Sequence, residues 1–300
     1  MNAYLGEIVA LITAVCWSFT SLLFTVAGKQ VGSRLVNRVR LLLAMPFLAI
    51  AHLLLQGEVL PVHVELSRWG WLGSSAIIGL VMGDGLLFYA FTLIGTRLSM
   101  LLMTLAPVIS TLLAWVFLDE TLSLVEIGAV IVTLSSVAWV VSERGNSGPA
   151  NSDPRNYVIG VLCGIGGAFG QALGLILSKQ GMAGGFPALS ASLIRVSVAV
   201  VVIWLWALAQ GQVRPTIEGL RNRRARRAIV GGSLAGPFVG MTLSLAAVQL
   251  THVGIASTLM SLSPVLLLPL VHWIFKERIS QRAIVGTVAA MVGVAMILWT

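Results

Sequence analysis

Long apolar runs separated by short polar connections recur along the whole chain. We place ten of them, at residues 5–27, 41–56, 69–93, 98–117, 122–142, 157–178, 187–209, 228–250, 253–275 and 281–299. Most approach the roughly 20 residues that a helix needs to cross about 30 Å of hydrocarbon. The alternating pattern of an outer-membrane β-barrel is missing. The pattern therefore predicts an all-α polytopic membrane protein with ten transmembrane helices.

Composition excludes a soluble globule. Of the 300 residues, 57% are hydrophobic and only 10% are charged, and the mean hydropathy is +0.96, which leaves too little polar surface to face water. In a soluble protein the net charge of +8 would suggest nucleic acid as a partner. Here most of the excess positive charge lies in short connections between apolar segments, where Lys and Arg indicate the orientation of the chain in a lipid bilayer. No nucleic-acid partner is therefore expected.

A polar stretch divides the ten segments five and five. Residues 142–155 read SERGNSGPANSDPR, combining Gly, Pro, Ser and charged residues as linkers do. We predict a first five-helix repeat over residues 1–142, a linker over 143–155 and a second repeat over 156–300.

The two halves resemble each other. The segment LLMTLAPVISTLLAWVFLDETLS from Leu101 aligns without gaps with TLMSLSPVLLLPLVHWIFKERIS from Thr258. The paired positions include Pro107 with Pro264, Glu120 with Glu277, Gly79 with Gly236, Gly83 with Gly240 and, at a slightly different offset, Arg40 with Arg195. Duplication of a five-helix unit accounts for this pattern. Because five is odd, the second copy enters the membrane from the opposite face, which predicts inverted repeats.

The basic residues are distributed asymmetrically between the two sides. Connections after segments 1, 3, 5, 7 and 9 hold nearly all of them, including the run Arg221, Arg223, Arg224, Arg226 and Arg227. The other side has little beyond Arg68 and Lys179. Since cytoplasmic connections carry the excess of Lys and Arg, both termini are predicted to be extracytoplasmic.

Polar and kinked positions near mid-membrane indicate a candidate substrate site. Trp17 and Ser21 share one face of the first segment, where Trp17 either lines a cavity or packs in the core. A proline inside a helix frees a carbonyl, and matched kinks in both repeats are a pointer to a midplane site, although a kink without ligand contact is the alternative. The candidate substrate-binding residues around these kinks are Met103, Thr104, Pro107, Ser261, Ser263 and Pro264.

One acidic residue, Asp84, lies well inside a segment. A carboxylate at that depth is costly unless it is paired or hydrated. It is therefore a candidate for substrate binding or proton coupling, with a structural role as the alternative. Arg40 and Arg195 are possible charge partners, for which snorkelling or structural pairing competes with substrate contact. The four histidines show no metal-ligand spacing, and we expect neither a metal nor a cofactor.

The chain resembles the drug/metabolite transporter superfamily, specifically its ten-helix EamA-like exporters. The matching features are Trp17 in VCWSFTSLLF, the arginines Arg40 and Arg195, the pairs Pro107-Val108 and Pro264-Val265, and the turns Asp119-Glu120 and Lys276-Glu277-Arg278. Within that family it is most similar to the YddG-type amino-acid exporters. The resemblance implies export of amino acids, aromatic ones included, across a bacterial inner membrane. It further implies a basket of helices 1–4 and 6–9, with helices 5 and 10 outside. Many relatives are drawn with cytoplasmic termini, the reverse of the orientation that the charge count favours.

The leading hypothesis is a secondary transporter that exports small metabolites, such as amino acids, by alternating access. A multidrug or nucleotide-sugar carrier of the same superfamily is the alternative. A channel would need a carbonyl filter or a charged ring, and an intramembrane enzyme would need clustered catalytic side chains; the sequence offers neither. The oligomeric state stays open, and a monomer is compatible with the pattern.

Overall fold

The computed structural model describes residues 4–117, 124–142, 154–251, 256, 259–275 and 280–296. Within these ranges every regular element is a helix. Six helical stretches are long and apolar enough to span a bilayer, and shorter apolar helices accompany them. The predicted linker residues 143–153, together with Asp119-Glu120 and Lys276-Glu277-Arg278, lie outside the described residues.

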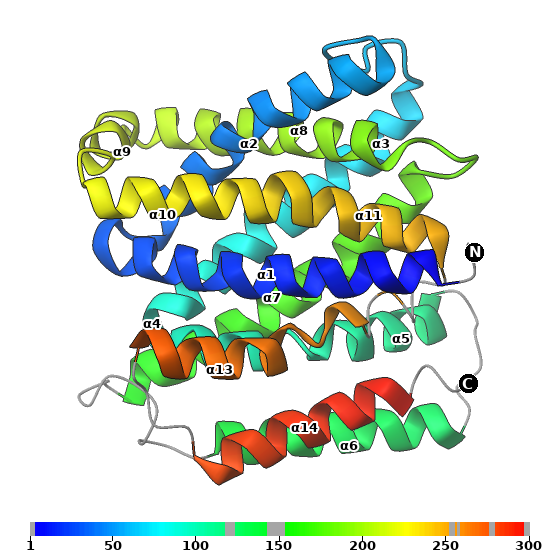
Figure 1. Ribbon diagram of the computed structural model, residues 1–300, viewed down its shortest axis with the longest axis vertical. Helices are drawn as coiled ribbons and strands as arrows, with labels where there is room; N and C mark the ends of the chain where they lie inside the picture. Colours follow the sequence, from blue (N-terminus) through cyan, green and yellow to red (C-terminus); the bar gives the residue numbers. More distant parts are fainter. Residues whose placement is uncertain are drawn as a thin grey trace.

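The helices of the first half follow the predicted order (Figure 1). They are α1 (Leu5–Val31), α2 (Ser33–Gln56), α3 (Leu66–Ala76), the π-helix η1 (Ile77–Gly83), α4 (Asp84–Leu102), α5 (Leu105–Phe117) and α6 (Leu124–Val141). α3, η1 and most of α4 form the third span. Gly95, whose φ of 80° suits glycine, turns the chain inside α4, so its last residues and α5 form the fourth span.

The second half repeats this order. It comprises α7 (Pro154–Gly181), α8 (Ala188–Ala209), the short α9 (Val213–Gly219), α10 (Arg223–Ser233), the π-helix η2 (Leu234–Gly240), α11 (Met241–Leu250), α13 (Ser263–Phe275) and α14 (Gln281–Met296). α10, η2 and α11 form the eighth span, and α13 and α14 belong to the ninth and tenth. In the described ranges the chain is thus an all-helical membrane protein with ten spans in two five-helix repeats.

Two predicted boundaries are wrong because they followed hydrophobicity alone. The second helix begins at Ser33, not at residue 41, so Arg38 and Arg40 lie inside it. Both are buried, and Arg38 Nη1 donates to the hydroxyl of Thr216 at 3.1 Å. The eighth span begins at Arg223, where the side chain of Asn222 accepts two backbone N–H groups and caps α10.

Contacts between the halves are reciprocal. The third span of the first half (α3, η1, α4) packs on α7, and the equivalent α10, η2 and α11 pack on α1. Likewise α5 contacts α7 while α13 contacts α1, and α2 pairs with its counterpart α8. This exchange is what two copies related by a two-fold axis produce. With five spans per copy, the axis lies in the membrane plane.

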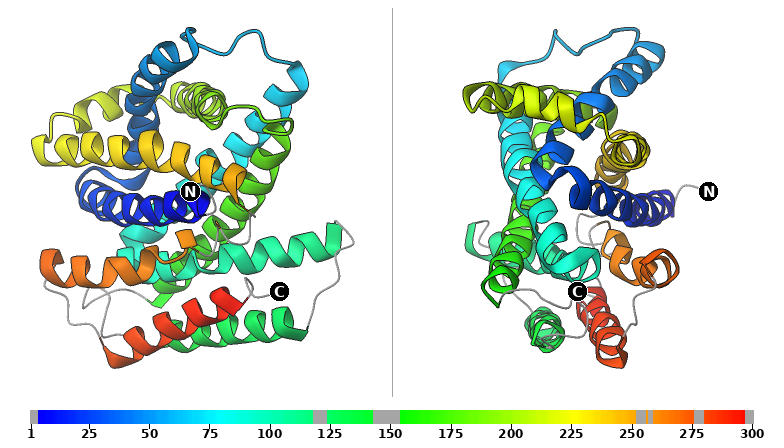
Figure 2. Two further views of the ribbon diagram at one scale, coloured as in Figure 1. Left: turned by 45° about the vertical axis from the view of Figure 1, so that its right-hand side comes forward. Right: turned by 90° about the vertical axis from the view of Figure 1, so that its left-hand side faces the viewer.

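α6 and α14 form a separate pair at one side of the molecule. They lie side by side below the other helices in Figures 1 and 2, and they pack far more extensively on each other than on any other element. The arrangement with helices 5 and 10 outside, implied by the family resemblance, is present.

The two π-helices occupy equivalent places in the repeats. Ile77 in η1 and Leu234 in η2 are separated by the same offset that pairs Gly79 with Gly236. A π-turn contains an extra residue and leaves part of the i→i−4 backbone ladder unpaired, and such turns often occur at functional sites. The third span of each repeat is therefore irregular at the same depth.

Glycines of α7 permit close approach to the third span. A Cβ atom on Gly170 would lie 2.7 Å from the Cα of Gly83, and one on Gly174 would lie 3.2 Å from the Cα of Gly79. Close backbone approach is the role that small residues fill between membrane helices. The glycines of α7 therefore allow its backbone to pack directly against the backbone of η1.

Candidate functional site

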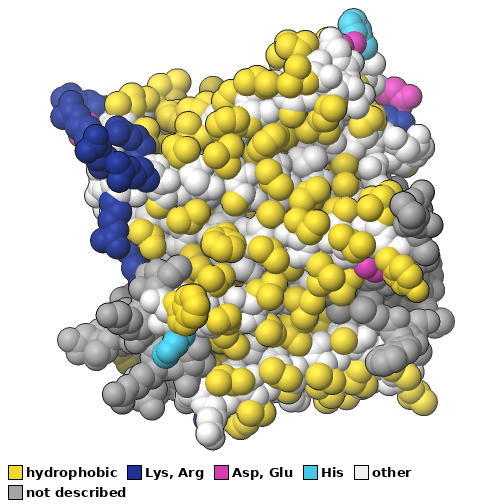
Figure 3. Space-filling view, in the orientation of Figure 1, with side chains coloured by type: hydrophobic (Ala, Val, Ile, Leu, Met, Phe, Trp, Pro, Cys, Tyr) yellow, Lys and Arg dark blue, Asp and Glu magenta, His cyan; other side chains and the backbone are white. Residues whose placement is uncertain are grey.

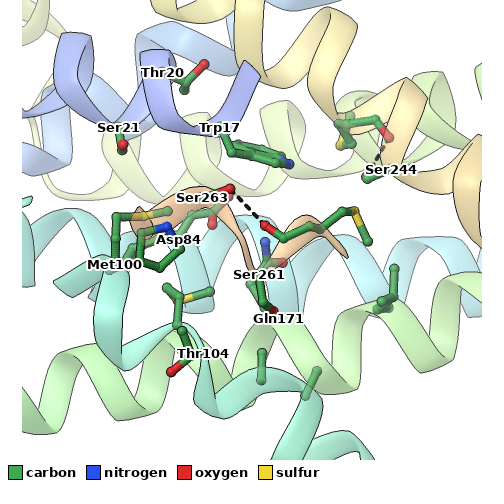
Figure 4. Close-up of a pocket in the computed structure, with 18 of the residues that line it drawn as sticks. Trp17, Thr20, Ser21, Asp84, Met100, Thr104, Gln171, Ser244, Ser261 and Ser263 are labelled. Atoms are coloured by element: carbon green, nitrogen blue, oxygen red, sulfur yellow. Dashed lines mark hydrogen bonds between the residues drawn. The ribbon is translucent and has the colours of Figure 1, made fainter. Parts of the chain in front are cut away.

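A cavity of about 150 Å³ lies between the two repeats, within the basket of helices. Its walls come from α1, η1, α4, α5, α7, α8, α11 and α13 and from the turns that precede α5 and α13. Figure 4 shows Trp17 and Ser21 on α1 facing the segment that carries Ser261 and Ser263, with Gln171 and Thr104 beyond it. The described parts of α6 and α14 contribute no lining residue.

The structure brings most of the candidate residues to this cavity. The candidates that line it are Trp17, Ser21, Asp84, Met103, Thr104, Pro107, Arg195, Ser261, Ser263 and Pro264. Arg40 does not line it and lies behind Asp84. Thr13, one turn before Trp17 on α1, also lies outside the cavity lining; it is fully buried, and its hydroxyl donates to the carbonyl of Val9 at 2.8 Å.

Both prolines follow a break in the helix and do not lie in a continuous kinked helix as predicted. α5 begins at Leu105 and α13 at Ser263, so Pro107 and Pro264 fall in first helical turns, where the missing N–H is tolerated. The carbonyls four residues earlier both find partners. The carbonyl of Met103 accepts the N–H of Ala106 at 3.0 Å, and that of Met260 accepts the hydroxyl of Ser263 at 2.8 Å.

Ser263 also ties α13 to α1. Its hydroxyl lies 3.0 Å from the carbonyl of Ala14, and its own carbonyl accepts a hydrogen bond from the hydroxyl of Ser18 at 3.0 Å. These bonds occupy the side chain and fix the broken segment against the first helix. Ser263 therefore shapes the cavity wall, and its hydroxyl is already engaged with backbone carbonyls.

Asp84 is held in a buried ion pair. Its Oδ2 lies 2.5 Å from Nη2 of Arg40, and the two side chains are 3% and 0% exposed. The Arg40 guanidinium also lies 4.7 Å from the ring centroid of Phe88, within range of a cation–π interaction. Of the alternatives for Arg40, the structure shows structural pairing.

The same cluster satisfies the backbone of η1. Asn37 accepts a hydrogen bond from Nε of Arg40 at 2.9 Å, and its amide nitrogen donates to the carbonyls of Leu80 at 3.3 Å and Val81 at 3.4 Å. Since the backbone is irregular at η1, these donors give its buried carbonyls hydrogen bonds from outside the helix. The charged pair and the irregular helix stabilise each other.

Arg195 differs from its counterpart Arg40. It is 4% exposed, lines the cavity and forms no salt bridge with any described residue. Its Nε lacks a hydrogen-bond partner. The cavity wall thus contains one ion-paired carboxylate and one cation that lacks a salt bridge within the described chain.

Several lining residues were absent from the sequence prediction. Gln171 on α7 is the clearest of these. A polar amide deep in a membrane helix indicates a functional position, but in the sequence it stands among closely spaced glycines that indicate helix packing. The apolar wall has no polar signal that separates it from core packing. Its members include Phe24, Phe88, Phe91, Met100, Met241 and Met260.

Comparison with known proteins identifies the family. The model of the EamA-like transporter family matches residues 4–142 and 158–299, one match for each half. No curated protein matches the sequence. One solved crystal structure, whose description names no activity, has 17% identity and a TM-score of 0.67 over 97% of this chain and 95% of that chain, a likeness of fold alone. Since the family matches cover nearly the whole chain, this protein belongs to the EamA-like transporter family, whose members are multi-pass membrane transporters of small molecules.

Proposed function

We propose that this protein exports amino acids, aromatic and other hydrophobic ones included, across a bacterial inner membrane by alternating access. The observation that carries the proposal is the cavity between the repeats, where aromatic and methionine side chains surround a few polar groups. An amino acid has the same division into an apolar body and a charged end. Inverted repeats meeting at a central site are the arrangement in which one repeat rocks against the other.

The cavity size favours a small solute. A volume of about 150 Å³ is comparable to an engineered apolar cavity that holds benzene. The side chain of phenylalanine carries a ring of that size. Adaptable methionines such as Met100 and Met260 suit a range of apolar side chains.

The charged groups argue against the other carriers of the superfamily. A cationic drug needs an available carboxylate. Among the described residues, the carboxylate that lines the cavity is that of Asp84, and it is already paired with Arg40. A nucleotide sugar carries two phosphates, which favour a cluster of cations. Among the described residues, a single cation, Arg195, lines the cavity, and this does not make such a cluster.

Counterflow in proteoliposomes tests the proposal. Vesicles preloaded with unlabelled phenylalanine should accumulate labelled phenylalanine, whereas labelled tetraphenylphosphonium and a labelled nucleotide sugar should not accumulate. The variant Ser261→Leu, which places an apolar side chain in the cavity, should abolish the signal without changing the unfolding temperature. Accumulation of the cation or the nucleotide sugar without any amino acid would overturn the proposal.

A further inference from the structure

The second repeat keeps the arginine of the first repeat but lacks its carboxylate. Arg195 is the counterpart of Arg40, while the counterpart of Asp84, at the offset that pairs the glycines of η1 and η2, is Met241. Met241 is buried and packs in the same cluster as residues that flank Arg195 on α8. A neutral thioether side chain therefore stands where symmetry would place a counterion for Arg195.

A second partner is also replaced. Asn37, which accepts a hydrogen bond from Nε of Arg40, corresponds to Ser192 in the second repeat. The hydroxyl of Ser192 and Nε of Arg195 are both buried without a hydrogen-bond partner. The counterparts of both side chains that neutralise or orient Arg40 are thus replaced around Arg195, and the carboxylate that acts on Arg195 electrostatically, Asp84, is already in contact with Arg40.

Arg195 is nevertheless almost as deeply buried as Arg40, which has a counterion. A buried cation is costly unless it is paired and hydrogen-bonded. Space is kept for its guanidinium at Gly79, where a Cβ atom would lie 3.3 Å from Nη2 of Arg195. Since the group lines the cavity, a ligand in the cavity is in position to provide the missing partner.

The geometry points to Arg195 as the group that binds a carboxylate of the transported solute. The substrate class is then a monocarboxylate with a small apolar body. This inference rests on the proposed function in one respect, that this cavity holds the substrate. A guanidinium binds a carboxylate through two parallel hydrogen bonds, and one negative charge balances Arg195 because the Asp84–Arg40 pair is already neutral.

Three probes of matched size separate the contributions of the carboxylate and the amino group. L-Phenylalanine has both groups, 3-phenylpropionate has only the carboxylate, and L-phenylalaninamide has only the amino group. Binding to the purified full-length protein is measured by calorimetry. We expect the first two probes to bind and the amide to bind at least about 30-fold more weakly, the change that corresponds to about 2 kcal/mol for a lost buried charge pair.

Two kinds of variant test the residue. Arg195→Gln keeps a polar side chain and should weaken 3-phenylpropionate binding by about 30-fold or more. Met241→Asp restores the missing acid of the repeat and should neutralise Arg195 from within the protein, whereas the matched Met241→Asn adds polarity without charge. We expect the aspartate variant to bind 3-phenylpropionate far more weakly than the asparagine variant does. Unfolding temperatures identify any variant that fails to fold.

The outcomes separate this inference from the proposed function. If phenylalanine and its amide bind equally and Arg195→Gln changes neither affinity, Arg195 is not the anchor, while amino-acid transport stands. If 3-phenylpropionate binds through Arg195 but no amino acid is bound or transported, the anchor stands and the proposed substrate is wrong. If no carboxylate probe binds the unmodified protein, the inference is overturned. Equal binding by the Met241→Asp and Met241→Asn variants would also overturn it.

Discussion

Trp17 contributes a large apolar surface to the cavity from the middle of α1. Replacing it with alanine removes that surface, and we expect the KM for the transported solute to rise about tenfold, equivalent to ~1.4 kcal/mol of lost contact. The indole is only half-buried, so the cost in stability should be smaller than for a core aromatic.

Phe19 provides the matched control for this prediction. It lies two residues from Trp17 on the same helix, is 49% exposed on the outside of the protein and does not line the cavity. Phe19→Ala should leave the KM unchanged in the same proteoliposome measurement. Equal effects of the two substitutions would show that Trp17 acts through the helix and not through the cavity.

The Asp84–Arg40 pair gives a second prediction at the residue scale. Asp84→Asn leaves the fully buried guanidinium of Arg40 without its counterion, which should destabilise the protein by about 3–5 kcal/mol. Removing both charges in Asp84→Asn/Arg40→Gln should recover much of this loss. The measurement is a double-mutant cycle on unfolding in detergent.

An additive cycle, in which the double variant is as unstable as the sum of the single ones, would contradict a coupled pair. The comparison also bears on the role of Asp84. Asp84 holds Arg40 in place, and Arg40 and Asn37 both donate to carbonyls of η1. Asp84 therefore affects the cavity by fixing the position of η1. A substitution of Asp84 therefore changes more than the charge of a ligand contact.

At the scale of elements, α7 and the third span approach each other backbone to backbone. In Gly170→Ala the added Cβ would meet the backbone of Gly83 at 2.7 Å, and no side-chain motion relieves this contact. The helices must separate, so we expect a loss of about 1–3 kcal/mol in the free energy of unfolding. Circular dichroism during unfolding in detergent measures it.

Gly70→Ala is the matched control on a helix. A Cβ atom there has no neighbour within 4 Å, so this variant should be as stable as the unmodified protein or slightly more stable, because alanine favours helix. A stable Gly170→Ala variant would mean that α7 and η1 are not as close as described.

The sequence predicted the elements better than their irregularities. Hydrophobic runs located all ten spans, because crossing hydrocarbon demands length and apolarity whatever the packing. The start of α2 was missed because Arg40 is buried through a partner 44 positions away, which no local pattern reveals. For Pro107 and Pro264 the sequence predicts kinks, whereas the structure has breaks before both residues. A proline in a sequence indicates that a backbone hydrogen bond is lost, but not how the chain rearranges around it.

The candidate site was likewise predicted only in part. Polar residues in apolar helices, such as Ser21 and Ser261, stand out in a sequence, whereas the apolar wall formed by Phe88 and Met241 looks like ordinary core. The difference between Arg40 and Arg195 depended on the structure. Their positions in the repeats are equivalent, and only the contacts show that one is paired.

At the scale of the whole molecule, charge gathers at one end of the helix bundle. Figure 3 shows the Lys and Arg side chains of one face clustered where α9 and the start of α10 lie. Arg223, Arg224, Arg226 and Arg227 are all exposed there. Arg38 and Arg40, which the sequence pattern placed in the connection after the first segment, are buried inside α2 and carry no information on orientation. On the opposite side, Arg68 donates to the carbonyls of Gly181 and Ala183 and has a structural role.

The exposed arginines still favour extracytoplasmic termini, and cysteine labelling in intact cells tests this orientation. In a background with Cys16 and Cys163 replaced by alanine, single cysteines are placed at Tyr4 and Ser67 on one side and at Gln212 and Arg223 on the other. All four positions are exposed. Because cytoplasmic connections retain positive charge, a membrane-impermeant maleimide should label the first two in intact cells and the last two only after lysis. Labelling of Gln212 and Arg223 from outside, with Tyr4 and Ser67 protected, would reverse the orientation and with it the direction in which the cavity must open to release an exported solute.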